Sequence, residues 1–231
     1  MQSPAAFHQP QKSNQDKINK ITTKNKEDVR LHDLTAADLL SLAKVLRENK
    51  SIKSIKLTIK ADEIPFPEHA LKEVFDTIQN NPQLKILAIS FTLCENFGDI
   101  GAVLFADFIR QNKNIIGSDL TRTNLGNKGV AALAEALKVN TSMKSINISW
   151  NDGFDDQGLT HIIDMCKVNT TLECCFLDKN LGITDAGVTQ LAEVMQTREK
   201  KIDFHISERH NISPGVVSQL EAACKSEAPR P

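Results

Sequence analysis

The sequence has few of the features that mark membrane, secreted or nucleotide-binding proteins. No apolar run approaches the roughly 18 residues that a membrane-spanning helix needs. The first 28 residues, MQSPAAFHQPQKSNQDKINKITTKNKED, contain no apolar segment like that of a secretory signal peptide. The formal net charge is only -1 over 231 residues, so charge gives no general attraction to nucleic acid or to an acidic membrane. We therefore expect a cytoplasmic protein that binds neither.

The cysteines do not form a pattern that indicates disulfides or a metal. Their number is odd, and no two are spaced as CxxC, which favours reduced thiols in a cytosolic protein. The five are Cys94, Cys166, Cys174, Cys175 and Cys224. If the adjacent Cys174 and Cys175 lie on a strand, they point to opposite faces of the sheet.

Motifs of catalysis and cofactor binding are also missing. The sequence contains neither a GxxxxGK[ST] phosphate-binding loop nor a GxSxG nucleophile motif. The six histidines are scattered along the chain. Two of them, His205 and His210, are five residues apart with Glu208 between them, and they are the pair considered as metal ligands. A strand at His205 and a loop at His210 need not bring the two together. We expect no catalytic residue, no cofactor and no metal.

A repeated unit is what the sequence does contain. Similar words follow a helix-ending residue six times: NKSIKSIKL, NPQLKILAI, NKNIIGSDL, NTSMKSINI, NTTLECCFL and REKKIDFHI. They begin at Asn49, Asn81, Asn112, Asn140, Asn169 and Arg198, at intervals of 32, 31, 28, 29 and 29 residues. A period of this size predicts stacked supersecondary units.

Each unit reads as a short strand, a turn and a helix. Ile146 and Ile148 alternate with polar residues, the period of a half-buried strand. In GVAALAEALKVN the apolar residues recur at helical spacing and form one stripe. The other helices are predicted over residues 35–48, 67–79, 99–111, 156–168, 184–196 and 213–224. Thr35 with Asp38 has capping-box spacing, and Thr184 is a natural N-cap.

These units predict an α/β fold, because neither a short strand nor one amphipathic helix buries its apolar face alone. Stacking gives a right-handed solenoid with a parallel sheet on its concave side, helices on its convex side, and about six repeats plus caps. We expect the repeat domain at residues 28–225. The polar segment 1–27 and the tail 226–231 are expected to be flexible, because they have little apolar surface to bury.

The segment LTRTNLGNKGVAALAEALKVNTSMKSINISWN resembles the leucine-rich repeat of the ribonuclease-inhibitor type. The resemblance covers about residues 29–224 and is strongest from 112 to 196. It implies that an asparagine after each strand bonds the backbone of neighbouring loops, a role that matches Asn151 and Asn180. The sequence departs from this pattern at Lys60, Thr92, Thr123 and Arg209, and Ser118 stands where an apolar strand residue is expected.

A candidate binding surface follows from the strand pattern. Large side chains recur at one outward position near the end of each strand, and exposed apolar stripes mark interaction sites. The predicted partner-binding residues on the concave face are Ile59, Phe91, Arg122, Trp150, Phe176 and Lys179. The alternative is structural: Trp150 folds under its own loop, NDGFDD, and Phe91 covers the insertion that follows it.

Three classes of function remain open. The leading one is a monomeric, non-catalytic module that binds a protein partner. The composition of the chain is similar to that of leucine-rich-repeat effectors that intracellular bacteria inject into the host cytosol. The segment ALAEALKVNTSMKSINIS also resembles the actin-capping repeat domain of tropomodulins, which implies a cytoskeletal adaptor. Ran GTPase-activating proteins share the repeat type, and this resemblance implies a role for Arg122 or Arg209.

Overall fold

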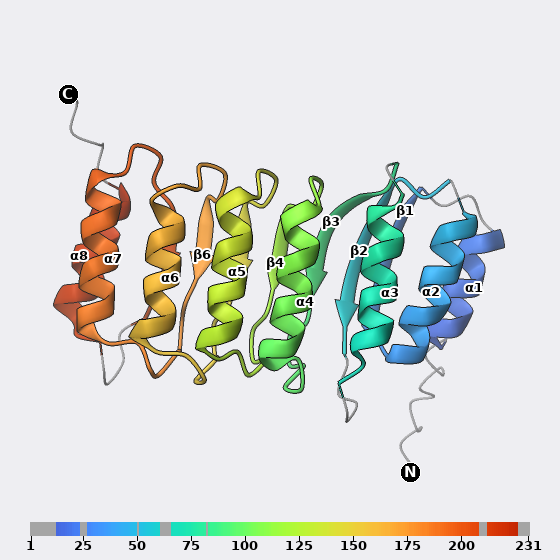
Figure 1. Ribbon diagram of the computed structural model, residues 1–231, viewed down its shortest axis with the longest axis horizontal. Coiled ribbons are helices and arrows are strands. Elements are labelled where there is room, and N and C mark those ends of the chain that lie inside the picture. Colours follow the sequence, from blue (N-terminus) through green and yellow to red (C-terminus); the bar gives the residue numbers. More distant parts are fainter. Residues whose placement is uncertain are drawn as a thin grey trace, which may run out of the picture.

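The computed structural model describes residues 13–23, 27–49, 51–60, 66–81, 83–207 and 212–225. Seven strands in these segments form one parallel sheet in chain order: β1 (Asp28–Leu34), β2 (Ser54–Ile59), β3 (Lys85–Ser90), β4 (Gly117–Asp119), β5 (Ser145–Asn147), β6 (Cys174–Phe176) and β7 (Asp203–His205). A helix follows each strand, and these helices stand in a row on one side of the sheet (Figure 1). The predicted α/β solenoid is confirmed.

The helices are α1 (Asn14–Thr23), α2 (Ala36–Glu48), α3 (Glu68–Gln79), α4 (Gly98–Gln111), α5 (Asn127–Val139), α6 (Asp156–Cys166), α7 (Asp185–Thr197) and α8 (Pro214–Lys225). Every helix predicted from the repeat is present, with ends within two residues of the expected ones. Thr35 and Asp38 form the predicted capping box, and the Thr184 hydroxyl caps α7 by accepting from the Ala186 amide. In the described segments no helix has the length and apolar character needed to cross a bilayer.

The N-terminal end contains more secondary structure than the sequence predicts. Helix α1 lies in the segment predicted to be flexible, packs beside α2 and β1, and buries Ile18 completely. Strand β1 pairs in parallel with β2 and is followed by α2, so a complete strand–helix unit stands at the N-terminal end, where a cap was expected. Residues 1–12 and 226–231, also expected to be flexible, lie outside the described residues.

The core lies between the sheet and the helices. Strand register aligns one inward position of six strands, and five of the six residues there are apolar: Leu57, Ile89, Ser118, Ile146, Cys175 and Phe204. Ser118 is the exception that the sequence flagged. Its buried hydroxyl donates to the Ile89 carbonyl at 2.7 Å, which satisfies its hydrogen-bonding need inside the core.

A ladder of polar side chains joins the units after the strands. The buried Asn151 accepts from the amides of Thr123 and Leu125 at 2.9 and 3.0 Å, and it donates to the Leu120 carbonyl at 2.9 Å. Asn180 accepts from the Asn151 amide at 2.6 Å. The backbone-bonding role that the family resemblance implied for Asn151 and Asn180 is therefore present.

The departures from this ladder are partly corrected. Thr123 does occupy the asparagine position, and its hydroxyl donates to the Leu120 carbonyl at 2.7 Å. In the preceding unit, strand register puts the buried Cys94 there, and not Thr92. Lys60 aligns with Thr92 and is likewise two residues early, while Arg209 lies outside the described residues.

A second ladder explains why the repeated words begin with asparagine. Asn140 donates to the Ile109 carbonyl, and Asn169 donates to the Leu137 carbonyl, each at 2.6 Å and each one unit back. At the next equivalent position, the Arg198 guanidinium donates to the carbonyls of Cys166 and Asn169. Arginine therefore replaces asparagine here while bonding the same kind of backbone group.

Candidate functional site

The chain turns sharply just after four consecutive strands. The turning residues are Leu93, Arg122, Trp150 and Lys179, whose φ angles are 66°, 55°, 60° and 61°. We call these four residues the strand-end row. Left-handed backbone costs a residue with a Cβ about 1–2 kcal/mol, so surrounding bonds must hold it. They do so from unit to unit: the amides of Leu93 and Trp150 donate to the next unit's Thr121 and Asp178 carbonyls at 2.9 and 2.8 Å.

Trp150 is the central side chain of the strand-end row. It is 41% exposed, and its ring lies between two cations from the units on either side. The Arg122 Cζ and the Lys179 Nζ are each 4.3 Å from the ring centroid. Each such cation–π contact at an exposed site contributes about 0.5–1 kcal/mol. The ring is therefore accessible and held in place.

The structural alternative for Trp150 is wrong. It does not fold under the NDGFDD loop, because Phe154 from that loop fills the core there and is 1% exposed. For Phe91 the alternative is closer to the structure, since this side chain packs inward and not toward solvent.

Two of the predicted binding residues are corrected. Ile59 and Phe91 are both completely buried, so neither can contact a partner on the sheet face. The Phe91 ring centroid lies 4.4 Å from that of Phe97 and 5.4 Å from that of Phe105. Ile59 is the last residue of the six-residue strand β2, Phe91 directly follows the six-residue strand β3, and both keep the inward alternation of their strand. Leu93, two residues after Phe91 and 52% exposed, occupies the strand-end row instead.

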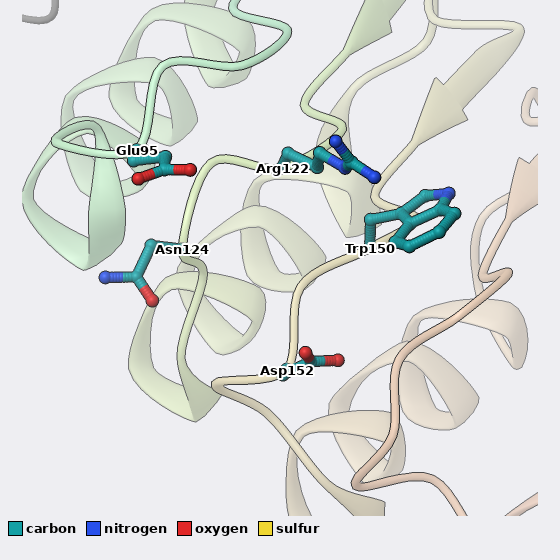
Figure 2. A pocket seen from close by; sticks show the side chains of 5 residues that line it. All are labelled: Glu95, Arg122, Asn124, Trp150 and Asp152. Carbon is teal, nitrogen blue, oxygen red and sulfur yellow. The ribbon is translucent and has the colours of Figure 1, made fainter.

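A hollow of about 450 Å³ opens beside Trp150. Its lining residues come from three consecutive strand-to-helix loops: Glu95, Arg122, Asn124, Trp150 and Asp152. Figure 2 shows the Arg122 guanidinium beside the indole ring, with the two carboxylates placed around the hollow. The hollow therefore combines an aromatic wall, one cation and two anions, which suits a polar or charged side chain of a partner.

A second group of side chains lies on the outward face of β6 and β7. Phe176 is half-buried, and its ring stacks on the His205 ring with centroids 4.3 Å apart and planes inclined by 15°. The His205 Nε2 is 3.1 Å from the Asp203 Oδ2. Cys174, on the strand next to Asp203, completes the group.

The state of the Cys174 thiol follows from its surroundings. Burial first, and then the nearby Asp203 carboxylate, raises the pKa of this thiol above its usual value. The thiol is therefore neutral at neutral pH, which disfavours a reactive nucleophile. None of the five cysteines, all among the described residues, forms a disulfide. Cys175 is buried while Cys174 is half-buried, which confirms that the pair points to opposite faces.

The group around Cys174 was not predicted from the sequence. The sequence offered His205 with His210 as a pair and favoured no metal there, and His210 and Glu208 lie outside the described residues. The useful signal was the period itself, since Cys174 and Asp203 are one 29-residue repeat apart and so become neighbours across two strands. Arg122, Trp150, Phe176 and Lys179 are at least partly exposed, and their role in binding stays a prediction.

Comparison with known proteins gives likeness in structure alone. No protein-family model and no curated protein matches the sequence. Leiomodin-1 actin-binding site 2 aligns with a TM-score of 0.56 and 16% identity, over 64% of this chain and 86% of that one. The tropomodulin C-terminal domain of Caenorhabditis elegans aligns with a TM-score of 0.51 and 12% identity, over 81% and 92%. The leucine-rich repeat-containing protein LegL7 of Legionella pneumophila gives 0.46 and 12%, over 93% and 78%.

These likenesses lie well below the identity at which function transfers, so they concern the fold. The fold itself consists of repeated strand–turn–helix units with a parallel sheet in chain order. The chain therefore has the leucine-rich-repeat fold.

Proposed function

We propose that this protein is a non-catalytic protein-binding module whose partner contacts the strand-end row around Trp150. The observation that carries the proposal is the exposed indole ring held between Arg122 and Lys179. Tryptophan and arginine are enriched among the residues that contribute most to binding energy. A large ring left in solvent contributes little to folding, so contact with another molecule is the better explanation for its position.

Pre-organisation supports the same surface. Binding usually costs about 0.5–1.5 kcal/mol for each flexible side chain that becomes fixed. Here the ring is already confined by two cations, and the backbone under it is fixed by the bond from the Trp150 amide to the Asp178 carbonyl. A partner that covers Trp150 therefore loses less entropy than one that must order a free side chain.

The proposed surface extends in both directions from Trp150. Leu93, which replaces the buried Phe91 in the strand-end row, adds an exposed apolar contact at one end. Phe176 adds an aromatic surface on the sheet face at the other. The hollow between Glu95 and Asp152 adds polar groups at the rim. An apolar centre with a polar rim is the usual anatomy of a protein interface.

The test compares Trp150→Ala with Val139→Ala. Val139 is 55% exposed at the end of α5 on the helix side, so its truncation controls for loss of exposed apolar area. A partner is first captured with the wild-type chain and purified, and its dissociation constant is then measured for all three proteins. Removing a hot-spot side chain costs about 2 kcal/mol or more, or roughly a thirty-fold weaker constant.

Two outcomes decide the matter once circular dichroism shows that both variants are folded. We expect Trp150→Ala to weaken binding about thirty-fold and Val139→Ala to leave it unchanged. If Trp150→Ala binds like the wild type, or if both variants lose affinity equally, the partner does not use the strand-end row and the proposal fails.

Actin is a second candidate partner, and a specific observation favours its inclusion. The chain aligns over 86% of leiomodin-1 actin-binding site 2, whose name states what that protein binds. Co-sedimentation with filamentous actin tests this candidate directly. Sedimentation of the wild-type chain, reduced in Trp150→Ala, would identify actin as the partner, whereas a chain that stays in the supernatant at all actin concentrations would exclude filaments.

A further inference from the structure

Three side chains with metal-binding donors lie together on the outward face of the sheet. Cys174 in β6 is paired in register with Asp203 in β7, and His205 lies two residues after Asp203 on the same face. The thiol sulfur, a carboxylate oxygen and an imidazole nitrogen all lie within 4.8 Å of one another. Within the described segments this is the one group of three such donors with that geometry.

The separations are close to those of a tetrahedral zinc ion. Bond lengths of about 2.3 Å to sulfur and about 2.0–2.2 Å to nitrogen and oxygen place neighbouring donors roughly 3.5 Å apart. The Asp203 Oδ2 and His205 Nε2 are already 3.1 Å apart. The other two separations, at no more than 4.8 Å, must close by at most about 1.3 Å, on the same zinc bond lengths.

The side chains that must move are free to do so. The side chains of Asp203 and His205 are 67% and 44% exposed, so rotation about their χ angles meets little of the core. Phe176 limits this movement for the imidazole, because the stacked rings, 15° from parallel, favour sliding of the His205 ring within its own plane and leave its nitrogens at the ring edge. A metal ligand is held by such a contact without being blocked.

We infer that Cys174, Asp203 and His205 form a zinc-binding site on the sheet face. A sulfur, a nitrogen and an oxygen donor suit Zn²⁺, whereas calcium and magnesium prefer oxygen donors alone. Zinc binding displaces the proton of the Cys174 thiol to solvent, and the resulting thiolate and the Asp203 carboxylate balance the two positive charges of the ion. Three protein ligands leave the fourth position to water, which faces the solvent over the sheet. This inference does not depend on the proposed binding of a protein partner.

The experiment uses the full, untagged chain, reduced and freed of metal by a chelator that is then removed. Cobalt(II) is titrated as a spectroscopic substitute for Zn²⁺. We expect a thiolate-to-cobalt charge-transfer band and the intense visible bands of tetrahedral cobalt, both saturating at one ion per chain and both removed by added Zn²⁺. Cys174→Ser is expected to abolish the charge-transfer band. His205→Gln is expected to weaken zinc affinity at least ten-fold.

Cys224→Ser is the matched control, because Cys224 is another half-buried free thiol and lies in α8, outside the group of three donors. It should keep the full charge-transfer band. Circular dichroism establishes folding, and if Cys174→Ser does not fold, His205→Gln decides the matter, since its side chain is exposed. The site is refuted if the wild type gives no charge-transfer band. It is also refuted if the band survives in Cys174→Ser, or if folded His205→Gln binds zinc like the wild type.

Discussion

The backbone amide of Asn151 donates to the Oδ1 of Asn180, 2.6 Å away, and so ties one strand-end loop to the next. The Asn151 side chain repeats the arrangement one unit back, on the amides of Thr123 and Leu125. Both asparagines are buried, so water cannot replace these bonds. The ladder is therefore a set of buried polar groups that satisfy one another.

Asn151→Ala should destabilise the fold strongly. It leaves the amides of Thr123 and Leu125 and the Ile148 carbonyl buried without this partner, and each such group costs about 1–3 kcal/mol. We expect the free energy of unfolding in urea to fall by about 3 kcal/mol or more. Gln190→Ala, at an exposed position of α7, is the control and should change it by less than about 0.5 kcal/mol. A loss for Asn151→Ala as small as for the control would contradict the ladder's contribution.

Replacing each of two glycines near helix starts with alanine should change the stability of the protein in opposite directions. A Cβ at Gly187 would lie 2.7 Å from the Asp156 Cγ and 2.9 Å from the Leu159 Cδ2, so α6 and α7 must separate. Asp156 cannot move freely, because it accepts from the Thr184 amide at 2.9 Å. Gly215 in α8 has nothing within 4 Å of such a Cβ. Gly187→Ala should lower the melting temperature, while Gly215→Ala should raise stability by about 0.5–1 kcal/mol.

Replacing each of two partly exposed leucines with glycine should also change the free energy of unfolding in opposite directions. Leu93 has a φ of 66°, where glycine carries no Cβ penalty, so Leu93→Gly should raise the free energy of unfolding by up to about 1 kcal/mol. Leu87 is 38% exposed inside β3, and Leu87→Gly should lower it by about 1 kcal/mol, the cost of glycine in a strand. Chemical denaturation measures both. Equal losses in the two variants would show that Leu93 is not held in a left-handed turn.

Stability should fall at high pH, in part through Cys166. Burial raises the pKa of this thiol from its usual 9.0 to about 12, although Arg198 nearby opposes the shift. The unfolded chain therefore loses the proton first, so the contribution is complete below pH 9 and is lost as pH rises from 9 toward 12. One such group contributes a slope of at most about 1.4 kcal/mol per pH unit in this window.

The measurement is the free energy of unfolding in urea at several values between pH 8 and 11, for the wild type and Cys166→Ala. Alanine removes the titrating group, so its curve should be flatter above pH 9, whatever its stability at pH 8. Parallel curves would mean that Cys166 does not stay protonated in the folded protein.

The extent to which the sequence predicts this fold follows from the repeat. The period and the apolar stripe of each helix placed the helix ends within two residues, since neighbouring units repeat the same local interactions. The errors at Ile59 and Phe91 arose where the repeat changes length. The first units are two or three residues longer, so counting a fixed distance to the turn gave a position two residues too early. Alternation along β2 would have corrected Ile59, because Ile55 and Leu57 share its inward face.

Other parts of the candidate site do not follow from the sequence. The distance from a cation to the Trp150 ring depends on rotamers of long side chains, which no spacing in a sequence determines. The Cys174–Asp203 neighbourhood was available in principle from the 29-residue period. The closeness of His205 and His210 along the chain gives no such information, because it does not show which donors meet across neighbouring strands.

Among the described residues, β1 to β7 pair in strict chain order, and each strand–helix unit, one coil of the solenoid, contacts only the unit before it and the unit after it. Inserting or deleting one whole 29-residue coil would therefore leave every remaining junction of the same kind as before. Gain or loss of one such unit would lengthen or shorten the outward face of the sheet without changing the core packing within the other units. Relatives that differ in size should accordingly differ by whole coils.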